Sequence, residues 1–467
     1  MVNIVPWALA LVGIGQYLSP MVRRSWQLAG FSRNWDTYAP TIQSITSSCA
    51  TAHEDVLSGC ADMKLHGRTI YATCLSQGSK GEHRRWISPQ TVLRDQKLQK
   101  PRDELIAWNL DTDTVTILDL NNYANSDDRA FHGLDIVQVS PSLLSIYVIN
   151  HLPSGSVIEK FTHEPLKSSA SHVATFSNPS LVPNPHSVWA VPGEDTHSAF
   201  YVTSDKKHRS GLERVAEVVL QLRSSPLIYH STAAGWKSVS AILPGSGAIT
   251  GLKDPQSNRL FVAETTGGFI DVFDRVTLDG SMSEADASLA EGNVTFVQRI
   301  SLDFVPSGLA LDQPTGKDLY ISGLPRPFDF LAHHGVGPAD TLAHYGVGQA
   351  LPLLGYGSAQ YRPAAGSLVS RLSTGQLGSS FFGGDDTKKD EQEGDDKKSA
   401  ANQGYTSPPS VESVFVDQYG KLVNGSYSVV FDQSPTAGKG DLFVSGLSSK
   451  GMFHQDLDRK QLIDRPL

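Results

Sequence analysis

Hydrophobic residues in this chain recur mostly at every second position, a period that is typical of β-strands. The clearest stretch, RLFVAETTGGFIDVF at 259–273, has a Gly-Gly pair between two apolar runs and predicts a β-hairpin. Similar apolar cores, each followed by a polar turn, occur at 69–75, 145–151, 199–205, 318–324 and 441–447. Second strands are expected after several of these cores, at 156–161, 367–373 and 451–457.

Six similar hairpin cores indicate a repeated unit of short strands, which is the pattern of a β-propeller. We therefore predict an all-β fold, a six-bladed β-propeller that spans residues 46–467. A β-sandwich or two smaller barrels are the alternatives.

Two long loop insertions are expected inside the propeller, at 326–365 and 378–404. The first contains His333, His334 and His344, but no acidic residue stands at ligand spacing, which favours a plain loop over a metal site. The second is rich in charged residues and has almost no apolar ones after Phe382. Because such a segment cannot bury enough apolar surface to order itself, we expect it to be disordered.

The N-terminal region begins with an apolar run of fifteen residues, IVPWALALVGIGQYL at 4–18. This run is shorter than the roughly 20 residues of a spanning helix and has the length of a signal-peptide core. We expect residues 1–45 to form an apolar leader helix and a linker, acting as a secretory signal or an uncleaved anchor. The protein would then be secreted or membrane-anchored, and the sequons at Asn293 and Asn424 are compatible with a glycoprotein. Arg23 and Arg24 come after the run and favour a cytosolic location for the rest of the chain, so that a cytosolic protein stays an alternative.

The composition excludes several classes of protein. Of 467 residues, 39% are hydrophobic and 19% are charged, which fits neither a disordered chain nor a coiled coil. A net charge of −9 argues against nucleic acid as a partner and leaves a neutral small molecule as the expected one. The three cysteines, Cys49, Cys60 and Cys74, are too few for a disulfide framework.

Three short segments in this order, HEDV at 53–56, FHGLDI at 131–136 and IYVINH at 146–151, carry a resemblance to a known family. Together with the six repeats and the apolar leader, the chain resembles the serum paraoxonase/arylesterase family over roughly residues 45–325 and 408–455. The resemblance implies a calcium-dependent, six-bladed propeller that hydrolyses lactones and aryl esters, with a leader that associates with membranes.

The resemblance also implies roles for individual residues. His132 and His151 match a proposed histidine dyad, in which one imidazole takes a proton from water and the other orients it. The alternative is that both histidines only bond to backbone groups at the ends of strands. Glu54 and Asp55 match a pair that gives one carboxylate to each of two calcium ions.

The chain departs from the family where further calcium ligands are expected. The family's amide and carboxylate ligands are replaced by His186, Ser187, Gly247, Ser307 and Gly308. Of the catalytic calcium ligands only Glu54 matches, which is too few for so hard a cation. The family's disulfide to the C-terminal region is also impossible, because no cysteine follows Gly440. We expect the ring to close instead by pairing of the last hairpin with an N-terminal strand.

These observations predict a hydrolase of a small lactone or ester bound in the central channel, with the histidine pair as general base. A metal-independent isomerase or cyclase and a propeller that only binds its ligand are the alternatives, because the fold alone does not choose among them.

Overall fold

The computed structural model describes residues 49–458 with gaps, together with Ser19, Arg23 and Arg24 of the leader. The gaps are 77–101, 126–128, 153, 194–197, 209–223 except 213, 217 and 222, then 241–244, 254–257, 266, 277–289, 313–315, 326–366, 374–410, 418–425, 434–438 and 447–451. The predicted leader helix and both predicted insertions therefore lie almost entirely outside the described residues.

Among the described residues every named element is a strand, and these strands pair into six sheets. The first sheet contains β2 (Asp62–His66), β3 (Thr69–Cys74), β4 (Glu104–Asn109) and β5 (Thr114–Ile117). The second contains β7 (Phe131–Ser140), β8 (Leu143–Leu152), β9 (Gly155–His163) and β10 (Ser169–Phe176), with the short β6 (Asp119–Asn121) parallel to β10. The third contains β11 (Pro185–Ala190), β12 (Phe200–Ser204), β13 (Ile228–Ser231) and β14 (Gly235–Ser238).

The remaining three sheets complete the ring. The fourth contains β15 (Ser246–Gly251), β16 (Arg259–Glu264), β17 (Phe269–Arg275) and β18 (Val294–Ser301). The fifth contains β19 (Val305–Leu311), β20 (Asp318–Leu324), β21 (Ser367–Ser373) and β22 (Val411–Asp417). The sixth contains β23 (Ser426–Gln433), β24 (Lys439–Gly446), β25 (Met452–Asp458) and β1 (Cys49–Ala52).

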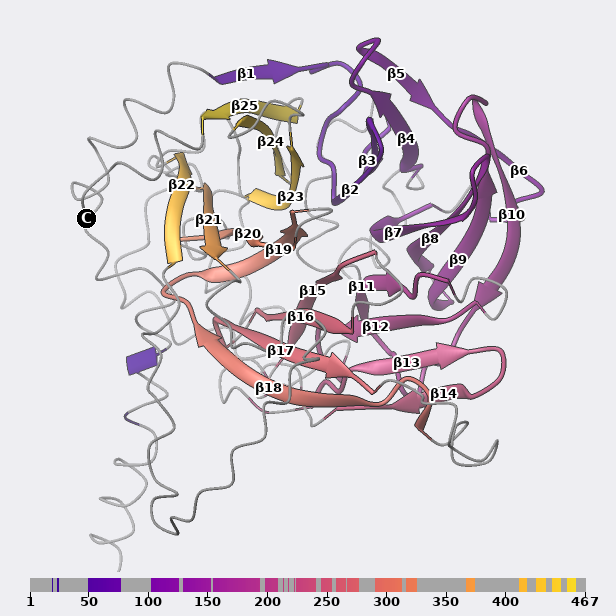
Figure 1. Cartoon of the computed structure of the whole chain (residues 1–467). Helices are drawn as coiled ribbons and strands as arrows, with labels where there is room; N and C mark the ends of the chain where they lie inside the picture. Colours follow the sequence, from indigo (N-terminus) through magenta and orange to yellow (C-terminus); the bar gives the residue numbers. More distant parts are fainter. Residues whose placement is uncertain are drawn as a thin grey trace, which may run out of the picture.

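The sheets lie around a common axis, with β2, β7, β11, β15, β19 and β23 innermost (Figure 1). Each pair of neighbouring sheets shares an apolar core of its own, and together these cores run around the whole ring. This is a β-propeller arrangement, in which every sheet buries both faces against its neighbours. The predicted all-β fold and propeller arrangement are therefore confirmed.

The repeated cores of the sequence all occupy the same place in their sheets. They form β3, β8, β12, β16, β20 and β24, the second strand from the axis in each sheet. The hairpin predicted at 259–273 is confirmed, because β16 pairs with β17 from Arg259 opposite Asp274 to Glu264 opposite Phe269. Gly268 in its turn has a φ of 67°, a conformation that glycine adopts without strain.

Closure of the ring is non-covalent, as predicted. Strand β1 pairs antiparallel with β25, from Cys49 opposite Gln455 to Ala52 opposite Met452. The sixth sheet therefore joins strands from the two ends of the described chain.

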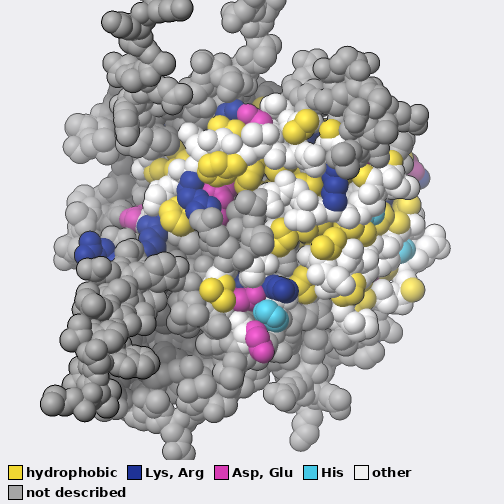
Figure 2. All heavy atoms as spheres, turned by 90° about the horizontal axis from the view of Figure 1, so that it is seen from below, with side chains coloured by type: hydrophobic (Ala, Val, Ile, Leu, Met, Phe, Trp, Pro, Cys, Tyr) yellow, Lys and Arg dark blue, Asp and Glu magenta, His cyan; other side chains and the backbone are white. Residues whose placement is uncertain are grey.

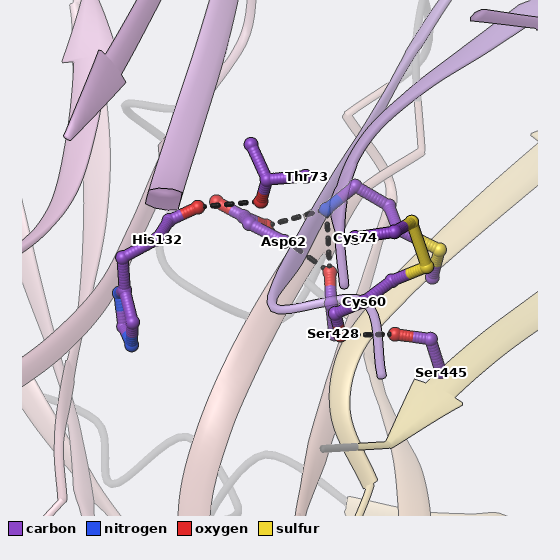
Figure 3. The surroundings of a disulfide bond; sticks show 8 residues. Cys60, Asp62, Thr73, Cys74, His132, Ser428 and Ser445 are labelled. Atoms are coloured by element: carbon purple, nitrogen blue, oxygen red, sulfur yellow. Dashed lines mark hydrogen bonds between the residues drawn. A yellow bond between two sulfur atoms is a disulfide. The ribbon is translucent and has the colours of Figure 1, made fainter. Parts of the chain in front are cut away.

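A disulfide that the sequence analysis did not predict joins Cys60 to Cys74 within the first sheet. Both residues are fully buried; Cys60 lies just before β2 and Cys74 is the last residue of β3 (Figure 3). The bond thus fixes the two edges of one hairpin near the axis.

One leader residue, Arg24, contacts the fourth sheet. Its guanidinium donates to the carbonyl oxygens of Gly267 (3.1 Å), Gly268 (2.6 Å) and Leu302 (2.7 Å), and it lies 4.7 Å from the centre of the Phe269 ring. No helix among the described residues has the length and apolar character needed to cross a membrane.

The outer surface carries mixed side chains. In the view from below (Figure 2), hydrophobic side chains are spread among polar ones over the described surface, and acidic side chains lie beside several of the basic ones. The described part of this face shows no extended basic area of the kind that binds a nucleic acid backbone.

Candidate functional site

The histidines predicted as a dyad lie close together in the second sheet. His132 belongs to β7 and His151 to the end of β8, and their ring centres are 5.4 Å apart in an edge-to-face arrangement. The β7–β8 register shifts between Phe131 and Leu134, so that His132 lies at an irregularity of the ladder. The Nδ1 of His151 is 2.8 Å from the hydroxyl oxygen of Ser156 on β9.

A third histidine, His186 at the start of β11, completes the cluster. Its ring centre is 4.7 Å from that of His132, and its backbone carbonyl lies 2.9 Å from the Nδ1 of His132. A carbonyl oxygen only accepts hydrogen bonds, so that Nδ1 of His132 carries the proton. In a neutral ring the lone pair is then on Nε2.

Gly133 makes this close approach of β7 and β11 possible. A Cβ atom at this position would lie 2.4 Å from the carbonyl oxygen of His186 and 2.8 Å from the Cα of Ser187. Both distances are shorter than van der Waals contact, and therefore any larger residue would separate the two strands. Glycine thus follows His132 because only a residue without a Cβ lets the carbonyl of His186 come within hydrogen-bonding distance of the His132 ring.

Burial keeps His132 and His186 neutral. It is the main cause that holds the pKa of His132 well below the ordinary 6.5, and the neighbouring His186 and His151 lower it further. Burial also lowers the pKa of His186, against the opposing charges of Asp205 and Asp62. At neutral pH, His132 is therefore a neutral base rather than a cation.

The cluster opens onto a small pocket at one end of the central channel. The pocket is formed where the innermost strands of five sheets begin, and its polar side chains come from Asp62, His132, His186, Ser187 and Ser307. Its volume is about 10 Å³, which is room for one water molecule. A base and a water position are thus brought together at the axis.

Asp62 is a member of this site that the sequence analysis missed. Its Oδ2 accepts from the backbone N–H of Leu134 (3.0 Å), while Oδ1 accepts from the ammonium of Lys64 (2.9 Å). Oδ1 also accepts from the hydroxyl of Ser428 (3.1 Å), which lies beside Asp62 in Figure 3. Its carboxylate therefore ties the first, second and sixth sheets together. The available signal was an acidic residue at the start of the strand that precedes the apolar core at 69–75.

The backbone of His132 is fixed from the first sheet. The hydroxyl of Thr73 on β3 donates to the carbonyl oxygen of His132 at 2.7 Å (Figure 3). Because Thr73 precedes Cys74, the disulfide to Cys60 fixes the same stretch of β3 that is hydrogen-bonded to β7.

Glu54 and Asp55 are not brought to the pocket. Both are exposed residues of a turn before β2, closed by hydrogen bonds from Val56 N–H and Leu57 N–H to the carbonyl of His53. Neither residue lines the pocket with His132.

The donors present at the pocket do not fit calcium. This cation needs six to eight oxygen ligands, whereas the pocket offers imidazoles, hydroxyls and one carboxylate, Asp62, whose two oxygens already accept hydrogen bonds. Over the described ranges, no group of three or more His, Cys, Asp and Glu side chains could hold a metal ion.

Comparisons with known proteins assign no family. No model of a protein family matches the chain, and no curated protein matches it. Solved structures that are similar include a hypothetical selenium-binding protein from Sulfolobus tokodaii (9% identity, 68% of this chain and 65% of that one, TM-score 0.36). Another is a putative 6-phosphogluconolactonase from Bacteroides uniformis (14% identity, 56% of this chain and 63% of that one, TM-score 0.32). A third is a PQQ-bound aldose sugar dehydrogenase from Streptomyces coelicolor (11% identity, 88% of this chain and 98% of that one, TM-score 0.40). The chain spans slightly less than two thirds of the first two, and similarity at this level assigns no activity.

Proposed function

We propose that this protein is a six-bladed propeller enzyme that hydrolyses a small, neutral lactone or ester bound in the central channel, beside the histidine pocket. The observation that supports this proposal is the hydrogen bond from His132 Nδ1 to the carbonyl of His186, which leaves the lone pair on Nε2 beside a water-sized space. The six sheets would be six blades, the last completed by β1.

In the proposed reaction, Nε2 of His132 takes a proton from water while the oxygen attacks the ester carbonyl. The imidazolium that forms then gives this proton to the departing alkoxide. His186 would donate its ring N–H to the developing oxyanion, since it lines the same pocket. His151 would keep the His132 ring in place by its edge-to-face contact.

A metal-independent isomerase or cyclase is the second candidate. It is favoured by the same donor set that does not fit calcium, because such an enzyme needs only confinement and a proton-transferring group. Calcium content, measured by elemental analysis of the purified protein, tests the calcium dependence that the resemblance implies.

The deciding experiment measures hydrolysis of phenyl acetate and γ-butyrolactone by the wild type, His132→Gln and His53→Gln. Loss of the general base is expected to lower kcat/KM by about 10²- to 10⁴-fold. His53 lies outside the pocket and bonds to Asp113, so that its substitution is the matched control and should change kcat/KM by less than about twofold. Equal effects of the two substitutions, or no turnover of any ester or lactone by the wild type, would contradict the proposal.

The leader pattern supports a secretory route with membrane association as part of the same proposal. Fractionation of cells that express the full chain tests it, and recovery of the whole protein in the cytosol would argue against it.

A further inference from the structure

The outer edge of the fourth sheet is a long strand without the usual protection of an edge. Strand β18 (VTFVQRIS) has eight residues, whereas β5, β14 and β1, which are also outermost in their sheets, have four each (Figure 1). It pairs with β17 on one side, and no described strand pairs with the other. An open strand edge is a template for pairing with another chain, and proteins commonly block it with a short strand, lysine or proline. Strand β18 is not short and contains neither residue.

The exposed side chains of this strand carry no charge. Thr295, Phe296 and Val297 are consecutive exposed residues, and Phe296 is 53% exposed. The one charged residue of the strand, Arg299, is bound to buried carboxylates. Its guanidinium donates to Asp271 at 2.7 and 2.8 Å and to Glu264 at 2.5 Å. This charge is therefore compensated inside the sheet and gives little repulsion against a second chain.

A sequence for N-glycosylation begins immediately before this strand. Residues 293–295, Asn-Val-Thr, have the Asn-x-Ser/Thr pattern, and the structure leaves Asn293 partly exposed and Thr295 exposed. The backbone of Asn293 is fixed at the entry to β18, since its N–H donates to the carbonyl of Ala290 at 3.0 Å and its carbonyl accepts from the N–H of Val276 at 2.8 Å. A sugar chain attached at this residue would start at the first end of the open edge. The other sequon, at Asn424, lies outside the described residues.

We propose that Asn293 carries an N-linked oligosaccharide, which covers the outer edge of β18 and prevents association of the propeller through this strand. Such a modification is bulky and solubilising, which is what an uncharged, exposed edge lacks. The proposal rests on the secretory route proposed above and goes beyond the hydrolase activity, since Asn293 does not line the histidine pocket.

The modification needs a lipid-linked oligosaccharide as its co-reactant. The side-chain amide nitrogen of Asn293 forms a bond to the anomeric carbon of the sugar and loses one proton. The bond from that carbon to the diphosphate breaks, and the lipid diphosphate leaves.

The first test expresses the full chain in eukaryotic cells, once with its own leader and once behind a heterologous signal peptide. The purified protein is treated with peptide-N-glycosidase and analysed by mass spectrometry of the peptide that contains residue 293. The wild type is expected to carry a glycan there, and Asn293→Gln and Thr295→Val are expected to lose it. Thr295→Ser is the matched control, because it keeps the Asn-x-Ser/Thr pattern and should keep the glycan.

The second test measures association by gel filtration. Asn293→Gln is expected to lose soluble monomer to larger species, because the edge of β18 is then uncovered. Adding Val297→Lys to this variant places a charge on the exposed edge and should restore the monomer. Ser238→Lys, at an exposed position of β14 in the third sheet, is the matched control and should not restore it.

Two results would overturn the proposal. An unmodified Asn293 in wild-type protein secreted behind the heterologous signal peptide would remove the site, and an Asn293→Gln variant as monomeric as the wild type would remove its protective role. A failure of the proposed secretory route looks different. In that case the chain with its own leader stays unglycosylated in the cytosol, while the chain behind the heterologous signal peptide carries the glycan.

Discussion

The protonation of His132 depends on how a single side chain is buried. Its Nδ1 proton is committed to the carbonyl of His186, and its ring is only 5% exposed. Adding a second proton would place a charge in this buried site beside two other imidazoles, which is the cause of its lowered pKa. His132 therefore stays a neutral base over a wider pH range than an exposed histidine.

This residue sets the expected pH dependence of activity. A general base is active in its neutral form, and since the pKa of His132 is held well below 6.5, kcat/KM should stay nearly constant from about pH 8 to about pH 6 and fall only at more acidic pH. Initial rates with γ-butyrolactone across this range give the measurement. A decline centred on pH 6.5 or above would show that the base is an exposed histidine or another group.

The candidate site was only partly predictable at this scale. The resemblance placed His132 and His151 together, and the structure brings their rings to 5.4 Å. The resemblance could not predict the hydrogen bond between His132 and His186. These residues are 54 positions apart in the sequence and meet only because two sheets converge at the axis. Nor could the sequence around Glu54 show that the turn containing this residue is exposed to solvent.

At the scale of the element, the sequence pattern predicted the second strand from the axis in each sheet. These strands, such as β16 with its burial on both faces, are apolar runs that end in polar turns. Several of the innermost strands contain Gly, Ser or Pro among their apolar residues, as in SGAITG of β15 and VPSGLAL of β19. Small residues are needed where six strands approach one axis, and they remove the alternating pattern that predicts a strand.

The disulfide of the first sheet also belongs to this scale. A count of three cysteines does not show that Cys60 and Cys74 lie at facing ends of one hairpin, fourteen residues apart. Closing a loop of that length restricts the unfolded chain and is worth about 3 kcal/mol in the entropic account. It also stabilises the stretch of β3 that bonds to His132 through Thr73.

We therefore expect Cys60→Ala/Cys74→Ala to lower the free energy of unfolding by about 3 kcal/mol, as measured by urea denaturation. Alanine is chosen because both sites are fully buried and accept no polar replacement without cost. Thr73→Val is the companion variant, which removes the hydrogen bond to His132 and keeps the disulfide. An unchanged unfolding free energy in the cysteine variant would show that the disulfide does not form in the protein.

For the whole molecule, the ring determines which parts of the chain depend on one another. Each sheet packs against two neighbours through separate apolar cores, including one between the first and sixth sheets that contains Trp108 and Phe443. A propeller that opened at this junction would expose that core to water. The pairing of β1 with β25 is therefore as important for stability as the pairing within the other sheets.

The closure of the ring rests on four residue pairs between β1 and β25, with no covalent link across them. In an antiparallel pair, every second residue of an edge strand directs its backbone N–H to the partner strand, and proline has no N–H. Of the variants Ala50→Pro and Thr51→Pro, one therefore removes a hydrogen bond to β25, and the other affects only the outer side of β1. We expect the first of these to lower the unfolding free energy by about 1–3 kcal/mol and to make the apparent melting temperature fall by several degrees. The comparison of the two proline variants, with Thr51→Val as a substitution that suits a strand, separates loss of pairing from a change of side chain. If both proline variants melt like the wild type, β1 is not what closes the propeller, and the apolar core between the first and sixth sheets must hold the ring by itself.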